Sequence, residues 1–182
     1  MTAAAPAAAS APQRATLRFM LRHPAHVIAL GGGSGLSPRA PGTAGTLAAW
    51  AAFVLLEGQF GPLPWSALLL AGLLVGIWAC TLCARHLGIA DPGAIVWDEV
   101  LAFWAVLWLI APAGWLAQLI AFALFRFFDA AKPGPVGWAD RRFKPRQAGP
   151  IGWLQGFGIL FDDLVAAACT LALMLPTRAL WT

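Results

Sequence analysis

Long apolar runs, separated by short polar or turn-forming segments, dominate the pattern of this 182-residue chain. A helix that crosses a bilayer needs about 20 mostly apolar residues, with a range near 17–25. The runs cover approximately 44–57, 65–84, 94–111, 114–128 and 158–176. The second, third and fifth runs are long enough to span, whereas the first and fourth tilt, pack inside the bundle or cross only in part. The pattern therefore predicts an all-α, polytopic membrane helical bundle with about four to five spans.

Composition supports a membrane protein. The chain is 60% hydrophobic and 11% charged, with a mean hydropathy of +0.73, whereas globular domains carry about 25% charged residues. It has ten Trp and no Tyr, and Trp favours the headgroup level of a bilayer. Trp65, Trp97, Trp115 and Trp153 fall near the ends of predicted segments. A soluble chain of this length could not readily bury several such runs.

The first 30 residues differ in character from the rest. Residues 1–13 are rich in Ala and Pro and are expected to be disordered, and no secretory signal peptide is expected because the apolar segment behind a basic start is missing. Arg14, Arg18 and Arg22 follow at a spacing of four, which predicts a basic face on a short helix that breaks near Pro24. This segment either lies on anionic lipid or is a solvated lead-in. We predict a lead-in over 1–30 and a membrane-embedded domain over 31–182.

The distribution of basic residues predicts the orientation. Cytoplasmic loops of membrane proteins carry an excess of Lys and Arg. With a cytoplasmic N-terminus and five crossings, the predicted outside segments EGQFGPLP and APAG contain neither residue, and the tail adds only Arg178. The predicted inside segments hold Arg14, Arg18, Arg22, Arg39, Arg85, Lys132, Arg141, Arg142, Lys144 and Arg146. The basic segment 141–147 is interpreted mainly as an orientation and lipid-surface feature.

Carboxylates beside the apolar runs are the main candidates for chemistry, because a charge near hydrocarbon is costly and is usually functional. With the predicted topology, all of them lie at the cytoplasmic ends of their spans. These residues are Asp98, Glu99, Asp129, Asp162 and Asp163. We therefore expect separated pieces of chain to converge at one leaflet boundary.

The chemistry expected of these acids is metal binding. Asp98 and Glu99 point about 100° apart on a helix, so one or both can face the bundle. Oxygen ligands suit Mg²⁺, which usually takes one or two carboxylates together with water and substrate phosphate. The alternative is a set of structural salt bridges, but the cations are too few to neutralise every acid. Arg126 and Asp129 share a helical face, and Lys132 follows where Pro133 ends the helix, so metal and phosphate could be bound together.

A glycine-rich segment, GGGSGLSPRAPGTAGT at 31–46, precedes the first run. Ser34, Ser37, Thr43 and the amides at the start of a helix could hold a phosphate, with Arg39 as the counter-charge. It is not a Walker loop because no GK[ST] follows. A purely structural turn is the alternative interpretation.

Other reactive residues give weaker signals. Cys80 and Cys83 form a CxxC inside a predicted span, where a small apolar role is favoured over redox chemistry or zinc binding. His23, His26 and His86 lack metal-ligand spacing. No covalent Cys, Asp or His nucleophile motif of the known phosphatase types is present, so metal-activated water is the simplest mechanism.

Four blocks, in this order, resemble phosphatidylglycerophosphatase A. They are GSGLSPRAPGTAGTLAA, IVWDEVLAFW, FRFFDAAKPGPVGWADR and GILFDDLVAA, and they span roughly residues 33–168. Two departures are a DDLVAAA sequence that lacks an expected glycine and a longer link before the last block. The resemblance implies a bacterial inner-membrane, Mg²⁺-dependent enzyme that removes the terminal phosphate of phosphatidylglycerophosphate. It also implies an active site formed by the five acids.

We therefore expect a membrane lipid phosphatase that acts by Mg²⁺-assisted attack of water. Ser34, Arg39, Thr43, Arg126 and Lys132 are the expected phosphate-binding residues. The expected partners are a phospholipid substrate and the membrane, with no nucleic acid, and the oligomeric state stays open. A small ion or metal transporter is the alternative, but it predicts polar residues at mid-membrane rather than acids on one side. A structural membrane partner would not explain the grouped acids.

Overall fold

The structure is a computed structural model that describes residues 13–143 and 151–181. Within these ranges all regular elements are helical, which confirms the prediction of an all-α fold. The α-helices are α1 (Leu17–Met20), α2 (Pro24–Ala29), α3 (Pro41–Leu56), α4 (Pro62–Leu87), α5 (Trp97–Ile110), α6 (Trp115–Ala131), α7 (Pro135–Phe143) and α8 (Trp153–Met174). Short 3-10 segments are η1 (Gly31–Leu36), η2 (Glu57–Gln59) and η3 (Leu175–Leu180).

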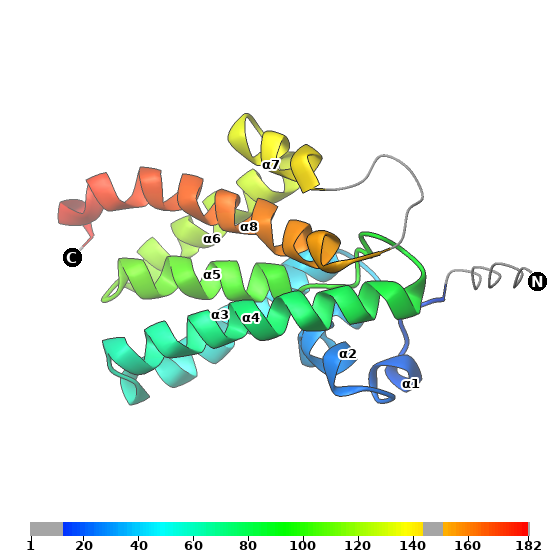
Figure 1. Ribbon diagram of the computed structural model, residues 1–182. Coiled ribbons are helices and arrows are strands. Elements are labelled where there is room, and N and C mark those ends of the chain that lie inside the picture. The colour runs from blue at the N-terminus through cyan, green and yellow to red at the C-terminus, as the bar shows by residue number, and fades with distance from the viewer. Residues whose placement is uncertain (1–12, 144–150, 182) are drawn as a thin grey trace, which may run out of the picture.

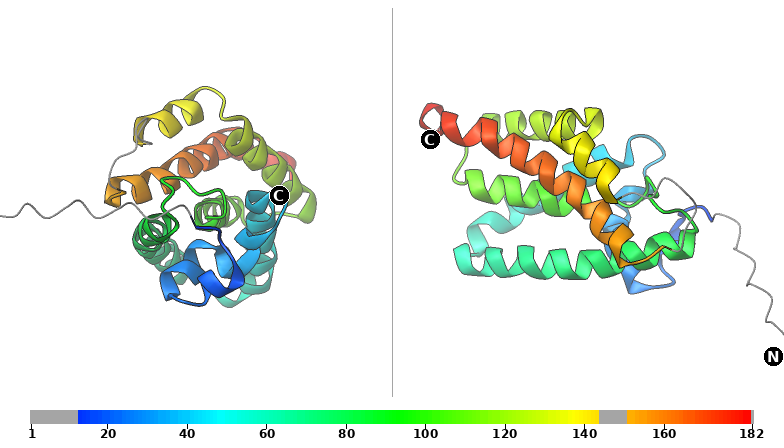
Figure 2. Two further views of the ribbon diagram at one scale, coloured as in Figure 1. Left: turned by 90° about the vertical axis from the view of Figure 1, so that its right-hand side faces the viewer. Right: turned by 45° about the horizontal axis from the view of Figure 1, so that its top comes forward.

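Helix α5 lies at the centre of the bundle. It contacts α3, α4, α6 and α8, and these helices surround it in Figures 1 and 2. Its sequence is apolar around most of its circumference, as expected for a helix enclosed by others. Phe103 and Val106 are fully buried. The two acids at its start are therefore placed at the edge of the main hydrophobic core.

Close contact between α4 and α5 depends on two glycines spaced four residues apart. A Cβ on Gly72 would lie 2.8 Å from Leu101, and one on Gly76 would lie 2.6 Å from the Trp97 ring. Trp97 Nε1 donates a hydrogen bond to the Gly72 carbonyl at 2.9 Å. Small residues at this spacing allow helices to approach closely inside a membrane. The packing fixes the start of α5 against α4.

Among the described residues, two helical stretches are long and apolar enough to cross a membrane, namely Pro62–Leu87 and Trp153–Ala179. Helix α5 has 14 residues, so it extends only about 21 Å at 1.5 Å per residue, against a hydrocarbon thickness of roughly 30 Å. The third apolar run was expected to span unaided, and its helix is too short for this. The predicted count of four to five spans is not confirmed.

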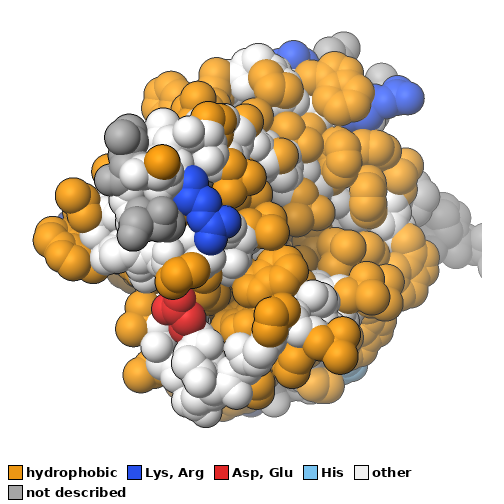
Figure 3. Space-filling model, turned by 90° about the vertical axis from the view of Figure 1, so that its left-hand side faces the viewer, with side chains coloured by type: hydrophobic (Ala, Val, Ile, Leu, Met, Phe, Trp, Pro, Cys, Tyr) orange, Lys and Arg blue, Asp and Glu red, His pale blue; other side chains and the backbone are white. Residues whose placement is uncertain are grey.

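Large apolar side chains remain exposed on the outside of the bundle. On α4 they include Leu70 and Leu74, at 60% and 62% exposure, and on α6 they include Leu116 and Ile120. Figure 3 shows hydrophobic side chains over most of the end opposite α1 and α2, with few charges. A soluble monomer rarely exposes so much contiguous apolar surface. This outer surface fits a lipid environment.

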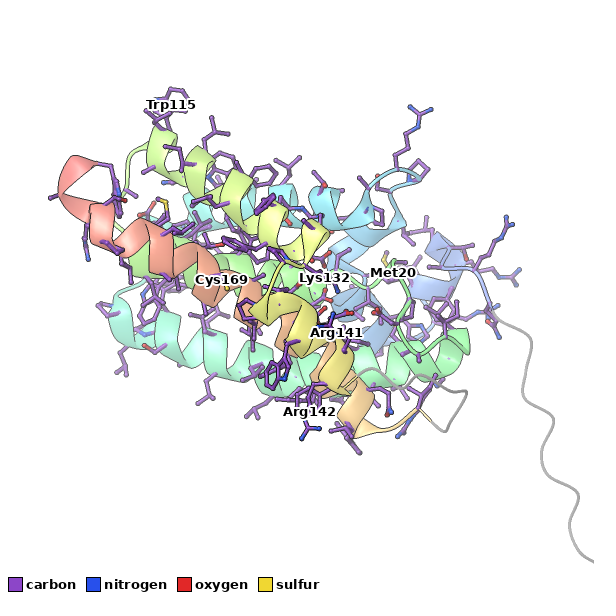
Figure 4. The ribbon with its side chains drawn as sticks, turned by 90° about the horizontal axis from the view of Figure 1, so that it is seen from above. Met20, Trp115, Lys132, Arg141, Arg142 and Cys169 are labelled. Carbon is purple, nitrogen blue, oxygen red and sulfur yellow. The ribbon has the colours of Figure 1, made fainter. Side chains whose placement is uncertain are left out.

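The four tryptophans expected at headgroup level behave differently from one another. Trp115 and Trp153 are 73% and 57% exposed, and Trp115 lies at the start of α6, away from Lys132 at its end (Figure 4). Trp65 is buried in the core, and Trp97 packs on α4. Both rings fill gaps between helices, and the placement of the four tryptophans at headgroup level stays a prediction.

The N-terminal segment folds back onto the bundle. Helix α1 contains only Leu17–Met20 and ends before Pro24, so Arg14, Arg18 and Arg22 do not share one continuous helical face as predicted. Met20, Ala25 and Leu30 are buried in a cluster with α4 residues such as Cys83. Residues 1–12 and 144–150 lie outside the described residues, so disorder over 1–13 and a role for the whole basic segment 141–147 stay predictions. A domain boundary at residue 30 also stays a prediction.

Candidate functional site

The candidate site lies where four separate parts of the chain meet. These are the start of α3, the start of α5, the end of α6 and the first half of α8. The last pair of acids was expected at the beginning of its span, but Asp162 lies nine residues into α8, about 14 Å along its axis. The helix begins earlier than predicted because Trp153 and the residues after it are also helical. The structure nevertheless brings the five predicted acids into one region.

Three of the acids form a compact group. One carboxylate oxygen from each of Asp98, Glu99 and Asp163 lies within 4.8 Å of the other two. Asp98 and Glu99 occupy the first turn of α5, where the positive end of the helix dipole favours negative charge. The Glu99 amide donates to Asp98 Oδ1 at 3.1 Å. Asp163 is buried on α8 and faces this pair.

Arg126 connects the acids of α5 and α6. Its Nη1 forms an ion pair with Asp129 and lies 3.8 Å from Glu99 Oε1. The same nitrogen lies 3.4 Å from Thr46 Oγ1 on α3. Thr46 itself donates to the Gly42 carbonyl at 2.9 Å, which fixes the hydroxyl at the start of α3. The guanidinium is therefore held between three helices beside the carboxylate group.

Lys132 connects the end of α6 to acids on α7 and α8. Its Nζ lies 2.6 Å from Asp162 Oδ2 on α8 and 2.5 Å from Asp140 Oδ1 on α7. Lys132 has a φ of +46°, a left-handed conformation that is unusual for a side chain with a Cβ. It ends α6 as predicted, because Pro133 disfavours a helical conformation in the residue before it. The turn directs the ammonium towards α7 and α8.

The predicted phosphate-binding residues are not brought together as a group. Arg126 and Lys132 flank the acids. Ser34 lies in η1, where its hydroxyl donates to the Gly31 carbonyl at 2.9 Å. Arg39 is exposed in the middle of the glycine-rich segment, before α3, and Thr43 is half-buried in the first turn of α3.

Three residues near the site were missed by sequence reasoning. Gly42 allows the close approach of α3, since a Cβ there would collide with Glu99 Oε1 and lie 3.1 Å from Arg126 Nη1. Thr46 is fully buried against Arg126, and Asp140 binds Lys132. The periodicity of small residues in PGTAGT could have indicated close packing of this helix. Nothing in the local sequence links Asp140 to Asp162.

The charge balance of the site favours a bound cation. Within the described residues, the four carboxylates of Asp98, Glu99, Asp129 and Asp163 are accompanied by one ion-pairing cation, Arg126, which binds Asp129 and lies 3.8 Å from Glu99. Glu99 Oε2 and Asp163 Oδ2 are buried and have no hydrogen-bond partner in the described part of the chain. A buried acceptor without a partner is costly, and a hard divalent cation takes oxygen ligands of this kind. The three grouped acids therefore fit a divalent metal.

A helical bundle with an apolar outer surface and a carboxylate centre flanked by two cations is the arrangement expected of a membrane-associated, metal-dependent enzyme for phosphate esters. A family model described as phosphatidylglycerophosphatase A matches residues 27–178. This match covers most of the chain, which therefore belongs to the phosphatidylglycerophosphatase A family.

Individual bacterial relatives agree with the family match. Phosphatidylglycerophosphatase A of Escherichia coli is 34% identical over 160 residues, covering 86% of this chain and 85% of the relative. That of Haemophilus influenzae is 37% identical over 150 residues, covering 82% and 86%. A putative phosphatidylinositol-3-phosphatase of Bacteroides thetaiotaomicron is 37% identical over 160 residues, covering 84% and 92%. No solved structure gave a significant match.

Proposed function

We propose that this protein is a phosphatidylglycerophosphatase, which hydrolyses the terminal phosphomonoester of phosphatidylglycerophosphate to phosphatidylglycerol and phosphate. The observation that carries the proposal is the grouping of Asp98, Glu99 and Asp163 beside Arg126 and Lys132 in a chain of this family. The family match favours this activity over the transporter considered from the sequence.

Asp98, Glu99 and Asp163 are the residues that would hold a divalent ion, for which Mg²⁺ is the proposed identity. Their oxygen-only donor set and the two buried oxygens without partners support this choice. When bound, such an ion would polarise a phosphoryl oxygen and lower the pKa of a water molecule that it binds. Asp129 and Asp162 are assigned a supporting role, since each is paired with a cation. The proposal therefore reduces the number of metal ligands from the five predicted acids to three.

Arg126 and Lys132 are proposed to neutralise the phosphate oxygens as negative charge develops in the transition state. A guanidinium carries five donors, so Arg126 can hold Asp129 and still donate to a phosphate. Thr46 fixes the position of the guanidinium from α3. A carboxylate of the centre would accept the proton of the attacking water. Ser34, Arg39 and Thr43 are proposed as secondary contacts to the headgroup from the segment that leads into α3.

The proposed location is the inner membrane of a bacterium, with several crossings, the N-terminus and the active site on the cytoplasmic side. The exposed apolar side chains of α4 and α6 support insertion in lipid, and the one-sided Lys and Arg distribution supports the orientation. Acyl chains of the substrate would remain in the bilayer while the headgroup reaches the carboxylates at the leaflet boundary.

The test is phosphate release by the purified protein from a panel of phosphorylated lipids. The panel contains phosphatidylglycerophosphate, phosphatidic acid and phosphatidylinositol 3-phosphate, the last because of the name of the Bacteroides relative. We expect phosphatidylglycerophosphate to have the highest kcat/KM. A clear preference for phosphatidylinositol 3-phosphate would overturn the headgroup assignment, and no release from any lipid would overturn the activity.

A further inference from the structure

Two neighbouring histidines, His23 and His26, meet a third from a distant part of the sequence, His86, at the end of α4. His26 Nε2 lies 2.7 Å from His86 Nδ1, and the His23 ring centroid lies 5.5 Å from that of His26 and 6.0 Å from that of His86. The His26 ring stacks on Phe19 at 4.0 Å, and its Nδ1 lies 2.9 Å from the Phe19 carbonyl oxygen. Sequence spacing could not reveal this group because α2 and α4 supply its members from about 60 positions apart.

The histidines line an open cleft of about 400 Å³ between the N-terminal segment and α4. Arg22 and Gln13 line it from the N-terminal side, and Arg85 lines it from α4. No carboxylate lines the cleft within the described ranges, and neither arginine forms an ion pair there. Arg85 is held in place because its Nε donates to the Ile151 carbonyl. The cleft therefore presents positive charge without a matching acid, which suits an anion.

The position of the cleft indicates which anion. Helix α4 is one of the two stretches able to span a membrane, and Arg85 and His86 lie in its last turn. The end of a spanning helix reaches the level of the lipid headgroups. Leu17 and Leu21 are 60% and 68% exposed beside the basic residues of the N-terminal segment. A basic site with adjacent exposed apolar side chains is typical of contact with an anionic membrane surface.

We propose that this cleft binds the headgroup phosphate of an anionic phospholipid, at a site distinct from the carboxylate centre. Arg22 and Arg85 supply the positive charge, while the rings of His23 and His86 line the cleft beside them. Burial lowers the pKa of His26 despite the hydrogen bond to the Phe19 carbonyl, and this ring forms the inner wall of the cleft. Binding at this site would fasten the N-terminal segment to α4 at the membrane surface. The proposal does not depend on the catalytic function.

The test counts phosphatidylglycerol molecules retained by the full chain, purified in a zwitterionic detergent, using native mass spectrometry. Arg22→Gln should weaken retention about fivefold, the effect expected for losing one arginine next to an anionic headgroup. The matched control is Arg18→Gln, an exposed residue four positions earlier that does not line the cleft. It should change retention by less than about twofold. Equal loss in both variants would overturn the proposal in favour of general surface charge.

Further measurements distinguish the source of the anion and the role of the charge. Arg22→Lys should restore retention, which separates lost charge from a folding defect. Phosphatidylcholine should not bind, and millimolar inorganic phosphate should not displace the lipid. Displacement by inorganic phosphate would overturn the lipid assignment. Turnover of Arg22→Gln should remain within about twofold, so this test can fail without affecting the catalytic proposal.

Discussion

Lys132 Nζ lies 2.6 Å from Asp162 Oδ2, so the residue that caps the end of α6 is joined to the middle of α8. The aspartate side chain is 4% exposed and the lysine 30%. A second contact to Asp140 ties the same ammonium to α7. This bridge sets the distance between the helix that carries Arg126 and the helix that carries Asp163.

Replacing Lys132 with Met should therefore damage both stability and turnover. Removing one partner of a buried ion pair is destabilising, by about 3 kcal/mol. We expect kcat to fall by at least about 100-fold, because a phosphate-facing charge is also lost. Denaturant unfolding in detergent and phosphate release measure the two effects. Lys132→Arg should recover most of the stability, and a Met variant with unchanged unfolding would contradict the bridge.

Gly42→Ala tests the close approach of α3 to the acids. The added Cβ would collide with Glu99 Oε1 and crowd the Arg126 guanidinium at 3.1–3.2 Å. Only side-chain ends must move, so the protein should fold. Displacement of the site should lower kcat by roughly 10- to 100-fold, since small misplacements are costly in catalysis. Gly93→Ala is the control because a Cβ there meets nothing within 4 Å. Normal turnover in the Gly42 variant would place the reacting groups elsewhere.

Phosphate release should require Mg²⁺ and should stop when a strong chelator is added. The reason is that the grouped carboxylates repel one another and bind substrate phosphate poorly without a cation. Mn²⁺ should substitute, because it also accepts oxygen ligands. The measurement is initial rate against free metal concentration. Full activity in excess chelator would refute the metal role of the acids.

The proposed orientation can be examined with reporter fusions. A reporter inserted at residue 146 should be read as cytoplasmic, and one in the segment 61–64 at the start of α4 as periplasmic. The basis is the excess of Lys and Arg on one side of the predicted spans. A periplasmic reading at residue 146 would put the carboxylate centre on the opposite side from the one proposed.

The sequence was sufficient to predict the all-α fold and the nearness of Asp98, Asp129 and Asp163, because apolar runs define helices and acids near hydrocarbon are selected for function. It could not give the length of α5, since hydropathy does not show that the helix begins only at Trp97 or that α5 is enclosed by its neighbours. For this reason the predicted count of four to five spans is not confirmed.

Contacts between residues far apart in the sequence could not be predicted from the sequence either. Thr46 and Arg126 are 80 positions apart, and His26 and His86 are 60 apart. Such pairs depend on how helices cross, which is determined by side-chain packing over the whole bundle. The left-handed turn at Lys132 could be predicted only in part. Pro133 predicted the helix end, but the direction of the ammonium towards Asp140 and Asp162 required the fold.

The most direct test of the central claim is phosphate release from phosphatidylglycerophosphate by Asp98→Asn and Asp163→Asn, measured against Mg²⁺ concentration. Asparagine preserves shape but removes the charge that holds a metal. Each variant should accumulate normally and lose at least about 100-fold in turnover, whereas the exposed Arg142→Ala should change turnover by less than about twofold. Near-normal turnover in both Asn variants, with the natural Mg²⁺ dependence, would contradict the assignment of the carboxylate centre.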